Sequence, residues 1–348
     1  MTSRRNMLIS ASALIGFSLA APAPTWSADG PVPVVATFSV LGDMVKRIGG
    51  DRVAVTTLVG ADGDTHVYQP TPADARAVSQ AEVLVFNGLE FEGWLDRLVD
   101  ASSFGGIRVV ATDGIQPIRL EDDDEHHDDH GEDDDHGHKD DHAAKDDHDH
   151  GHKDDHAAKD DHGDGDHHGH HHGVFDPHAW HDLAKAVVYV DNITAALART
   201  DPANASTYYG NRATYVAEIE ALDAEIREKI AGLPEDRRTV VTPHDAFGYY
   251  AEAYGLRFIA PQGLSTESEP SAGGVAALIR QIREEEITAV FVESLTDPRL
   301  IRQIADETGA SIGGTVYSDA LSGPDGPAST YLDMMRHNSG KFAEALSR

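Results

Sequence analysis

The sequence predicts an α/β protein of two lobes, each a mainly parallel sheet flanked by helices, joined by a long rigid helix and carrying a disordered His/Asp-rich insertion. Three observations support this fold class. Short apolar stretches alternate with helical ones on both sides of residues 121–173. Residues 203–233 keep a helical spacing of apolar side chains. Residues 121–173 contain almost nothing that can pack into a core.

The first lobe is predicted from an alternation of strands and helices that begins near residue 32. Val-rich runs such as VPVVATFSV are typical of buried strands, and segments such as TPADARAVSQ are typical of helices that open at a proline. This alternation indicates a parallel sheet covered on both faces. The predicted strands are 32–40, 52–60, 81–88 and 107–114, and the predicted helices are 42–48, 71–80 and 92–100.

The insertion at 121–173 has an unusual composition. It holds 22 Asp or Glu against four Lys, a formal charge of −18, and the stretch GHKDDHAAKDDH occurs at 137–148 and again at 151–162. Such a segment cannot bury enough apolar surface to offset the entropy of ordering it, so we expect disorder. An acidic solubilising linker is the alternative, but solubility needs only charge, which neutral imidazole does not add.

Imidazole beside carboxylate is instead the ligand set of borderline divalent metals, above all Zn²⁺. Sixteen of the 21 histidines lie in this insertion. We therefore predict low-affinity metal sites at His126, His127, His130, His136, His138, His142, His148, His150, His152, His156, His162, His167, His168, His170, His171 and His172.

After the insertion, residues 176–200 are predicted as a helix, and Pro202 opens a longer one. In that second helix Tyr215, Ile219 and Leu222 are spaced four and three apart, as on one helical face. It spans ~45 Å at 1.5 Å per residue, so it could bridge the two lobes. Alternation then resumes, with predicted strands at 238–247, 256–261, 287–294 and 313–319 and helices ending at 254 and at 271–285, 297–309 and 327–347.

The N-terminus has the pattern of a secretory leader. Arg4 and Arg5 precede an apolar run that is too short to span a membrane, and cleavage is expected near residues 20–28. The arginine pair also resembles a twin-arginine signal, but we favour the general secretory route. The predicted organisation is a signal peptide at 1–28, an N-terminal lobe at 29–120 and 174–200, the metal-binding loop at 121–173, a linking helix at 201–232 and a C-terminal lobe at 233–348.

Composition excludes several classes of function. The chain has no cysteine, so thiolate metal sites, disulfides and a lipid-anchored cysteine are excluded. The formal net charge of −32 argues against nucleic acid and anionic membranes as partners and is compatible with cations.

Four residues of the two lobes could complete one metal site. His66 follows a predicted strand, and His178 lies where the chain becomes ordered again. His244 and Asp319 lie at the carboxyl ends of strands, where ligands bind in open α/β sheets. If the lobes face each other, three imidazoles and one carboxylate would form a tetrahedral shell for Zn²⁺. Each residue alone could equally be a hydrogen-bonded structural side chain.

The chain resembles the zinc-uptake solute-binding proteins of ABC transporters, the ZnuA-like, metal-binding cluster A-I family. The matching stretches are DTHVYQPTPAD, FDPHAW, TPHDAFGYYAEAYGL, STESEPSA and VYSDALS, and the resemblance covers roughly residues 31–348. It implies that His66, His178, His244 and Asp319 are the metal ligands. It also implies a rigid helical linker and a His-rich loop above the site.

The sequence departs from the family pattern at Thr65, usually proline, and at His181, usually apolar. His181 lies three residues after His178, so one helical face could present both, and His181 is a candidate alternative ligand or supporting residue. Glu267 and Glu269 match a family loop and are candidates to support the site or to face the transporter.

The expected function is capture of Zn²⁺ in the periplasm and delivery to an ABC permease. Partners would be the permease and ATPase subunits, with a periplasmic zinc chaperone as a further candidate, and we expect a monomer that is not an enzyme. The alternatives are a Mn²⁺- or Fe²⁺-binding protein of the same family, an exported zinc hydrolase and a zinc buffer. The three imidazoles favour zinc over manganese, and no HExxH, nucleophile motif or phosphate-binding glycine loop supports catalysis.

Overall fold

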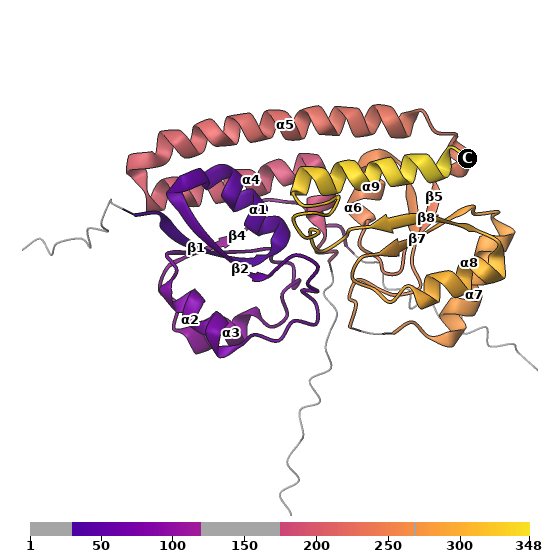
Figure 1. Ribbon diagram of the computed structural model, residues 1–348, viewed down its shortest axis with the longest axis horizontal. Helices are drawn as coiled ribbons and strands as arrows, with labels where there is room; N and C mark the ends of the chain where they lie inside the picture. Colours follow the sequence, from indigo (N-terminus) through magenta and orange to yellow (C-terminus); the bar gives the residue numbers. More distant parts are fainter. Residues whose placement is uncertain (1–29, 120–174, 268) are drawn as a thin grey trace, which may run out of the picture.

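The protein is seen here as a computed structural model that describes residues 30–119, 175–267 and 269–348. These residues form two parallel sheets of four strands, side by side beneath a layer of long helices (Figure 1). The predicted α/β fold of two lobes is therefore confirmed. The predicted leader and the predicted disorder of the His/Asp-rich insertion lie outside the described residues.

The first sheet has the strand order β2-β1-β3-β4, with every neighbouring pair parallel. Helices α1 and α4 pack on one face, and α2 packs against β1 and α3 on the other (Figure 1). Its elements are β1 (Val32–Phe38), α1 (Ser39–Gly49), β2 (Val53–Val59), α2 (Pro72–Gln80), β3 (Val83–Phe86), α3 (Leu95–Ser102), β4 (Ile107–Val110) and α4 (Leu183–Thr200).

The second sheet repeats this topology in the order β6-β5-β7-β8, again fully parallel. Helix α9 packs on β8, and α8 packs against β7 and β8. Its elements are β5 (Thr239–Val241), α6 (Gly248–Tyr254), β6 (Arg257–Ile259), α7 (Ala272–Glu284), β7 (Ala289–Glu293), α8 (Arg299–Thr308), β8 (Ser311–Val316) and α9 (Tyr331–Leu346).

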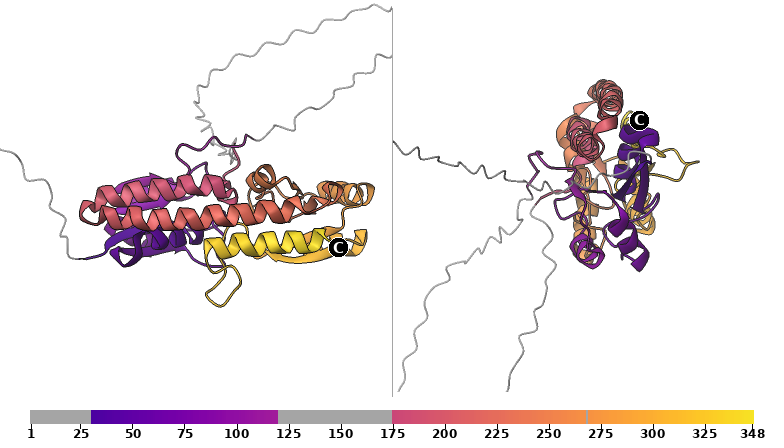
Figure 2. Two further views of the ribbon diagram at one scale, coloured as in Figure 1. Left: turned by 90° about the horizontal axis from the view of Figure 1, so that it is seen from above. Right: turned by 90° about the vertical axis from the view of Figure 1, so that its left-hand side faces the viewer.

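Helix α5 (Ala205–Ala231) runs along both lobes (Figures 1 and 2). It contacts α1 and α4 of the first lobe and α6 and α9 of the second. Its buried residues include Tyr215, Ile219 and Leu222, the face predicted from their spacing. One continuous apolar core extends from β1 through α4 and α5 to α9, so the helical layer joins the lobes by packing and not only by the chain.

The predicted helix at 176–200 is wrong at its start. Asp182 caps α4 by accepting a hydrogen bond from the Ala184 N–H at 2.8 Å, so the regular helix begins at Leu183. The preceding residues Ala179–His181 form a separate 3₁₀ turn. His178 therefore lies before the helix, in backbone that leads into the site.

None of the helices within the described ranges is both long and apolar enough to cross a membrane.

Candidate metal centre

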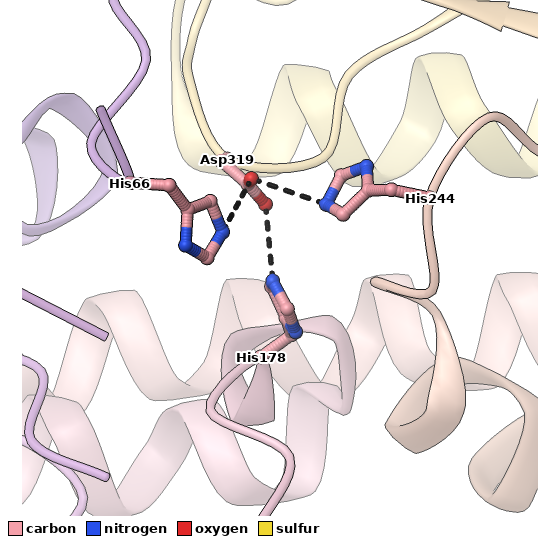
Figure 3. A group of neighbouring side chains, drawn as sticks. All are labelled: His66, His178, His244 and Asp319. Carbon is pink, nitrogen blue, oxygen red and sulfur yellow. Dashed lines mark ion pairs between the residues drawn. The ribbon is translucent and has the colours of Figure 1, made fainter. Parts of the chain in front are cut away.

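Four side chains converge at the junction of the two lobes: His66, His178, His244 and Asp319 (Figure 3). Each offers one ligand atom, and these atoms all lie within 4.8 Å of one another. The Asp319 carboxylate is central: its Oδ2 is 3.3 Å from Nε2 of both His66 and His244, and its Oδ1 is 3.5 Å from Nε2 of His178. All four residues predicted to form one site are thus neighbours.

The strand ends of both sheets bring these residues together. His66 lies on the loop that leaves β2, and Asp319 lies on the loop that leaves β8. His244 follows β5 and forms an isolated parallel bridge with Gln262, which extends the sheet toward the site. Parallel strands present all their carboxyl ends on one edge, so this edge of each lobe collects loops that can hold a ligand. His178 is the exception, because it precedes the 3₁₀ turn before α4.

Two of the imidazoles are held by a buried carboxylate on the ring nitrogen that faces away from the centre. His178 Nδ1 lies 2.8 Å from Asp176 Oδ1, which also accepts the His178 backbone N–H at 2.9 Å. His244 Nδ1 lies 2.5 Å from Glu293 Oε2. In the neutral ring, a carboxylate on Nδ1 favours the tautomer with the proton on that nitrogen, so that the Nε2 lone pair is directed at the centre.

Aromatic rings enclose the first lobe's side of the site. The Phe91 ring lies with its centroid 4.9 Å from that of His66 and 5.8 Å from that of His178. Trp180 packs on His178 with ring centroids 5.2 Å apart and donates its indole N–H to the Ser318 carbonyl at 3.0 Å. That hydrogen bond ties the rings to the loop that carries Asp319.

The ionisable side chains of the site shift one another's pKa values. Burial by itself lowers the pKa of the His244 imidazole, but the carboxylates of Glu293 and Asp319 outweigh burial and hold this pKa well above its ordinary value. Burial by itself raises the pKa of the Asp319 carboxyl, but His244 and His178 outweigh burial and hold this pKa well below its usual range. The site therefore keeps an ionised carboxylate where a cation would lie.

The donor atoms suit a divalent cation. The Nε2 atoms of the three histidines and both Asp319 carboxylate oxygens are buried, and none makes a well-formed hydrogen bond to another described residue. Buried polar atoms are nearly always paired, and a convergent set of unpaired lone pairs is what a bound cation would satisfy. A metal ion at this point would bind three nitrogens and one oxygen.

The supporting residues predicted from the sequence do not join this group. His181 is fully buried, but its ring packs between Trp180 and Phe247, at centroid distances of 5.6 and 4.6 Å. The single helical face expected to present His178 and His181 does not form, because the regular helix begins only at Leu183 and His178 has non-helical backbone before the 3₁₀ turn. Burial, followed by the nearby His178, lowers the pKa of His181 to about 3, so this ring is neutral.

Glu267 and Glu269 are exposed and outside the four-residue group. Glu269 instead lines a hollow at the lobe boundary of about 560 Å³, together with Val67 and Pro243. The histidines predicted in the insertion lie outside the described residues. Sequence reasoning missed Asp176, Glu293 and Phe91; only the two carboxylates left a signal, one in the FDPH stretch and one at the end of a predicted strand.

Two parallel-sheet lobes with a convergent imidazole–carboxylate group between them define the class of periplasmic solute-binding proteins that hold a metal ion. Residues 34–345 match the family described as zinc-uptake complex component A, periplasmic. The chain belongs to this family, the metal-binding cluster A-I of ABC transporter solute-binding proteins, and the resemblance seen in the sequence is confirmed. Its members are substrate-binding transport proteins.

The relatives differ in the metal in their names. The manganese-binding lipoprotein MntA of Halalkalibacterium halodurans is 29% identical over 99% of this chain and 98% of its own. The iron-binding protein YfeA of Yersinia pestis is 29% identical over 90% of this chain and 86% of its own. Among solved structures, the periplasmic zinc-binding protein TroA of Treponema pallidum has a TM-score of 0.74 at 26% identity and covers 92% of this chain and 100% of its own.

Proposed function

We propose that this protein captures Zn²⁺ in the periplasm and delivers it to an ABC permease. The observation that carries the choice of zinc is the donor set with its spacing. Zinc bonds of ~2.0–2.2 Å to nitrogen and oxygen give tetrahedral edges of about 3.3–3.5 Å. Oδ2 of Asp319 is 3.3 Å from Nε2 of His66 and of His244, the length of such an edge, and Nε2 of His178 is 3.5 Å from the other carboxylate oxygen, Oδ1.

Ligand chemistry favours zinc over the other metals in this family. Manganese suits carboxylate, carbonyl and water oxygens in six-coordinate sites, whereas zinc accepts imidazole in tetrahedral sites. Within the group only Asp319 contributes oxygen, and His66, His178 and His244 each supply a nitrogen. Manganese or iron remains the competing cargo that an experiment must compare.

The geometry gives no support to the hydrolase alternative. Catalytic zinc keeps one coordination position open for water and needs a base beside it. Asp319 is the one carboxylate in the group, and it contacts all three imidazoles, so it supports a fourth ligand rather than a free base. A shell of four protein ligands also suits a protein that must hold its metal ion during diffusion.

The remaining parts of the proposal follow from the sequence and the family. We propose that the leader is removed near residues 20–28 and that the mature chain acts in the periplasm as a monomer. Its partners would be the permease and ATPase subunits and, as a further candidate, a zinc chaperone. The lobes at 29–120 with 174–200 and at 233–348 would each contribute half of the site, and the loop at 121–173 would add weak zinc sites.

Competition between metals tests the proposal. Zn²⁺ and Mn²⁺ are titrated into the metal-free protein against chelators of known affinity, with His337→Ala as a control histidine that lies on α9 and outside the four-residue group. We expect one tight site per chain that prefers zinc by much more than tenfold, or about 1.4 kcal/mol. Equal or tighter manganese binding would overturn the choice of zinc, and loss of tight binding in His337→Ala would overturn the choice of site.

A further inference from the structure

Two buried glutamates lie toward the carboxyl ends of corresponding strands, one as the last residue of its strand and the other in the loop that leaves its strand. Glu293 is the last residue of β7, and Glu92 follows β3. These strands hold the same place in the two sheet orders: β7 lies beside β5 and β3 lies beside β1. Both side chains are buried, at 1% exposure for Glu293 and 6% for Glu92. A buried carboxylate is expensive unless its oxygens are paired, so its partners indicate what it does.

Glu293 contacts the two loops that carry the second lobe's ligands. Its Oε1 accepts the backbone N–H of His244 at 3.1 Å, and its Oε2 lies 2.5 Å from Nδ1 of the same ring. The same Oε2 accepts the hydroxyl of Ser318 at 2.9 Å, and Ser318 is the residue immediately before Asp319. One carboxylate therefore holds a ligand ring, the backbone of that ligand and the neighbour of a second ligand.

Glu92 makes contacts of the same kind, but none of them reaches a metal-site residue. Its Oε1 accepts the hydroxyl of Thr37 at 2.6 Å and the N–H of Asn87 at 2.8 Å, and its Oε2 accepts the N–H of Gly88 at 3.3 Å. The first lobe thus uses its buried glutamate to organise a strand end. The second lobe uses the corresponding glutamate to organise two ligands.

We propose that Glu293 is a positioning residue that sets the selectivity of the site for zinc, an inference that rests on the proposed zinc function. It fixes His244 with the proton on Nδ1, and it holds that ring at a set distance from Asp319. Zinc draws much of its affinity from imidazole in a fixed tetrahedral arrangement, whereas manganese depends more on oxygen donors and tolerates water in the shell. Loosening His244 should therefore cost zinc more than manganese.

The experiment compares Glu293→Gln with Glu92→Gln in the whole chain. Glutamine keeps the size of glutamate, but its amide N–H facing Nδ1 would favour the wrong His244 tautomer. Affinities for Zn²⁺ and Mn²⁺ are measured at pH 8, where protons compete least with metal for imidazole. We expect Glu293→Gln to lose ~10–100-fold in zinc affinity, the range for residues that support a metal ligand, and to lose several-fold less for manganese.

The matched variant supplies the control for removing a buried charge. Glu92→Gln should destabilise the metal-free fold but leave the ratio of zinc to manganese affinity at the wild-type value. Bound Co²⁺ gives a second readout. Its visible absorption band should be weaker in Glu293→Gln than in the wild type, because a four-coordinate tetrahedral Co²⁺ ion absorbs more strongly than one that has gained further ligands. A merely structural role for Glu293 would move the unfolding midpoint but not this spectrum.

The outcomes distinguish a failure of the positioning role of Glu293 from a failure of the proposed zinc function. If Glu293→Gln and Glu92→Gln change the zinc-to-manganese ratio equally, or not at all, the positioning role is wrong. If Glu293→Gln does not fold, Ser318→Ala, which removes one contact of Glu293, should lower the same ratio by a smaller factor, and no change in that variant would overturn the inference. If the wild type itself prefers manganese, the proposed function fails, whatever the variants show.

Discussion

The two halves of the metal centre are built differently. The second lobe supplies His244 and Asp319, both fully buried and both linked to Glu293, directly or through Ser318. The first lobe supplies His178 and His66 from separate segments, and the His66 side chain keeps 7% of its surface exposed. The His178 ring has its own carboxylate in Asp176, whereas at His66 the carboxylate of Asp64 accepts the backbone N–H.

This difference indicates which ligand side chains are already held in position before the metal binds. A histidine whose ring Nδ1 and backbone N–H are both held by a carboxylate loses little freedom when it binds a metal. More of the energy of its metal bond therefore appears as affinity. His244 and His178 are held in this way and His66 is not. The second lobe therefore acts as the prepared half, and His66 is the ligand that solvent can replace most easily.

The largest effect is expected from removal of His244. His244→Ala deletes a prepared nitrogen donor and removes the imidazole beside the buried Oε2 of Glu293, which carries an additional penalty. Zinc affinity should fall by more than ~100-fold, beyond the range for residues that only support a ligand. Chelator competition measures this loss, with His337→Ala as the control. If His244→Ala bound zinc with wild-type affinity, the assignment of His244 as a metal ligand would be wrong.

A smaller loss is expected from removal of His66. In His66→Ala the other three residues remain, and water can take the fourth position, as it does in zinc sites with three protein ligands. We expect a loss of about tenfold in affinity, expressed mainly as faster zinc release in stopped-flow exchange against a chelator. Equal losses in His66→Ala and His244→Ala would break the distinction between the two halves.

Zinc binding should also release a proton. The carboxylates of Glu293 and Asp319 hold the pKa of His244 well above its ordinary value, so the metal-free site carries a proton on this ring at neutral pH. Zinc must displace it, so affinity rises with pH until His244 titrates. Calorimetry in buffers of different ionisation enthalpy should show about one proton released at pH 7.

The same measurement in His244→Gln checks the source of that proton. Glutamine carries no titratable proton, and Asp319, whose pKa is held well below its usual range, is already ionised. Proton release at pH 7 should therefore fall toward zero in this variant. Unchanged release would assign the proton to another group and contradict the prepared, carboxylate-held state of His244.

The smallest effect is expected from the insertion. Deleting residues 121–173 should leave the affinity of the tight site within about threefold, because an equilibrium constant does not depend on the route of loading. The same deletion should remove several weak zinc sites and slow loading from a weak chelator, since tethered sites raise the local zinc concentration. A large loss of tight binding would instead indicate that residues 121–173 contain the tight zinc site.

Much of this arrangement was predictable because it depends on the order of elements. Val-rich strands alternating with helices predict the parallel sheets, and strand ends predict where His244 and Asp319 lie. Glu293 was missed because a glutamate at the end of a strand has the same sequence pattern whether it faces solvent or a ligand. The expectation at His181 failed because of local backbone: the Asp182 cap delays α4 to Leu183, and His178 lies before the 3₁₀ turn with non-helical backbone.

The most direct test of the central claim is a crystal structure of the zinc-loaded protein with anomalous diffraction at the zinc edge. The account predicts one dominant peak enclosed by His66, His178, His244 and Asp319, at about 2.0–2.1 Å from each of the three Nε2 atoms and about 2.0–2.2 Å from one carboxylate oxygen. A dominant peak elsewhere, or a zinc ion at this point without His244 in its shell, would contradict it.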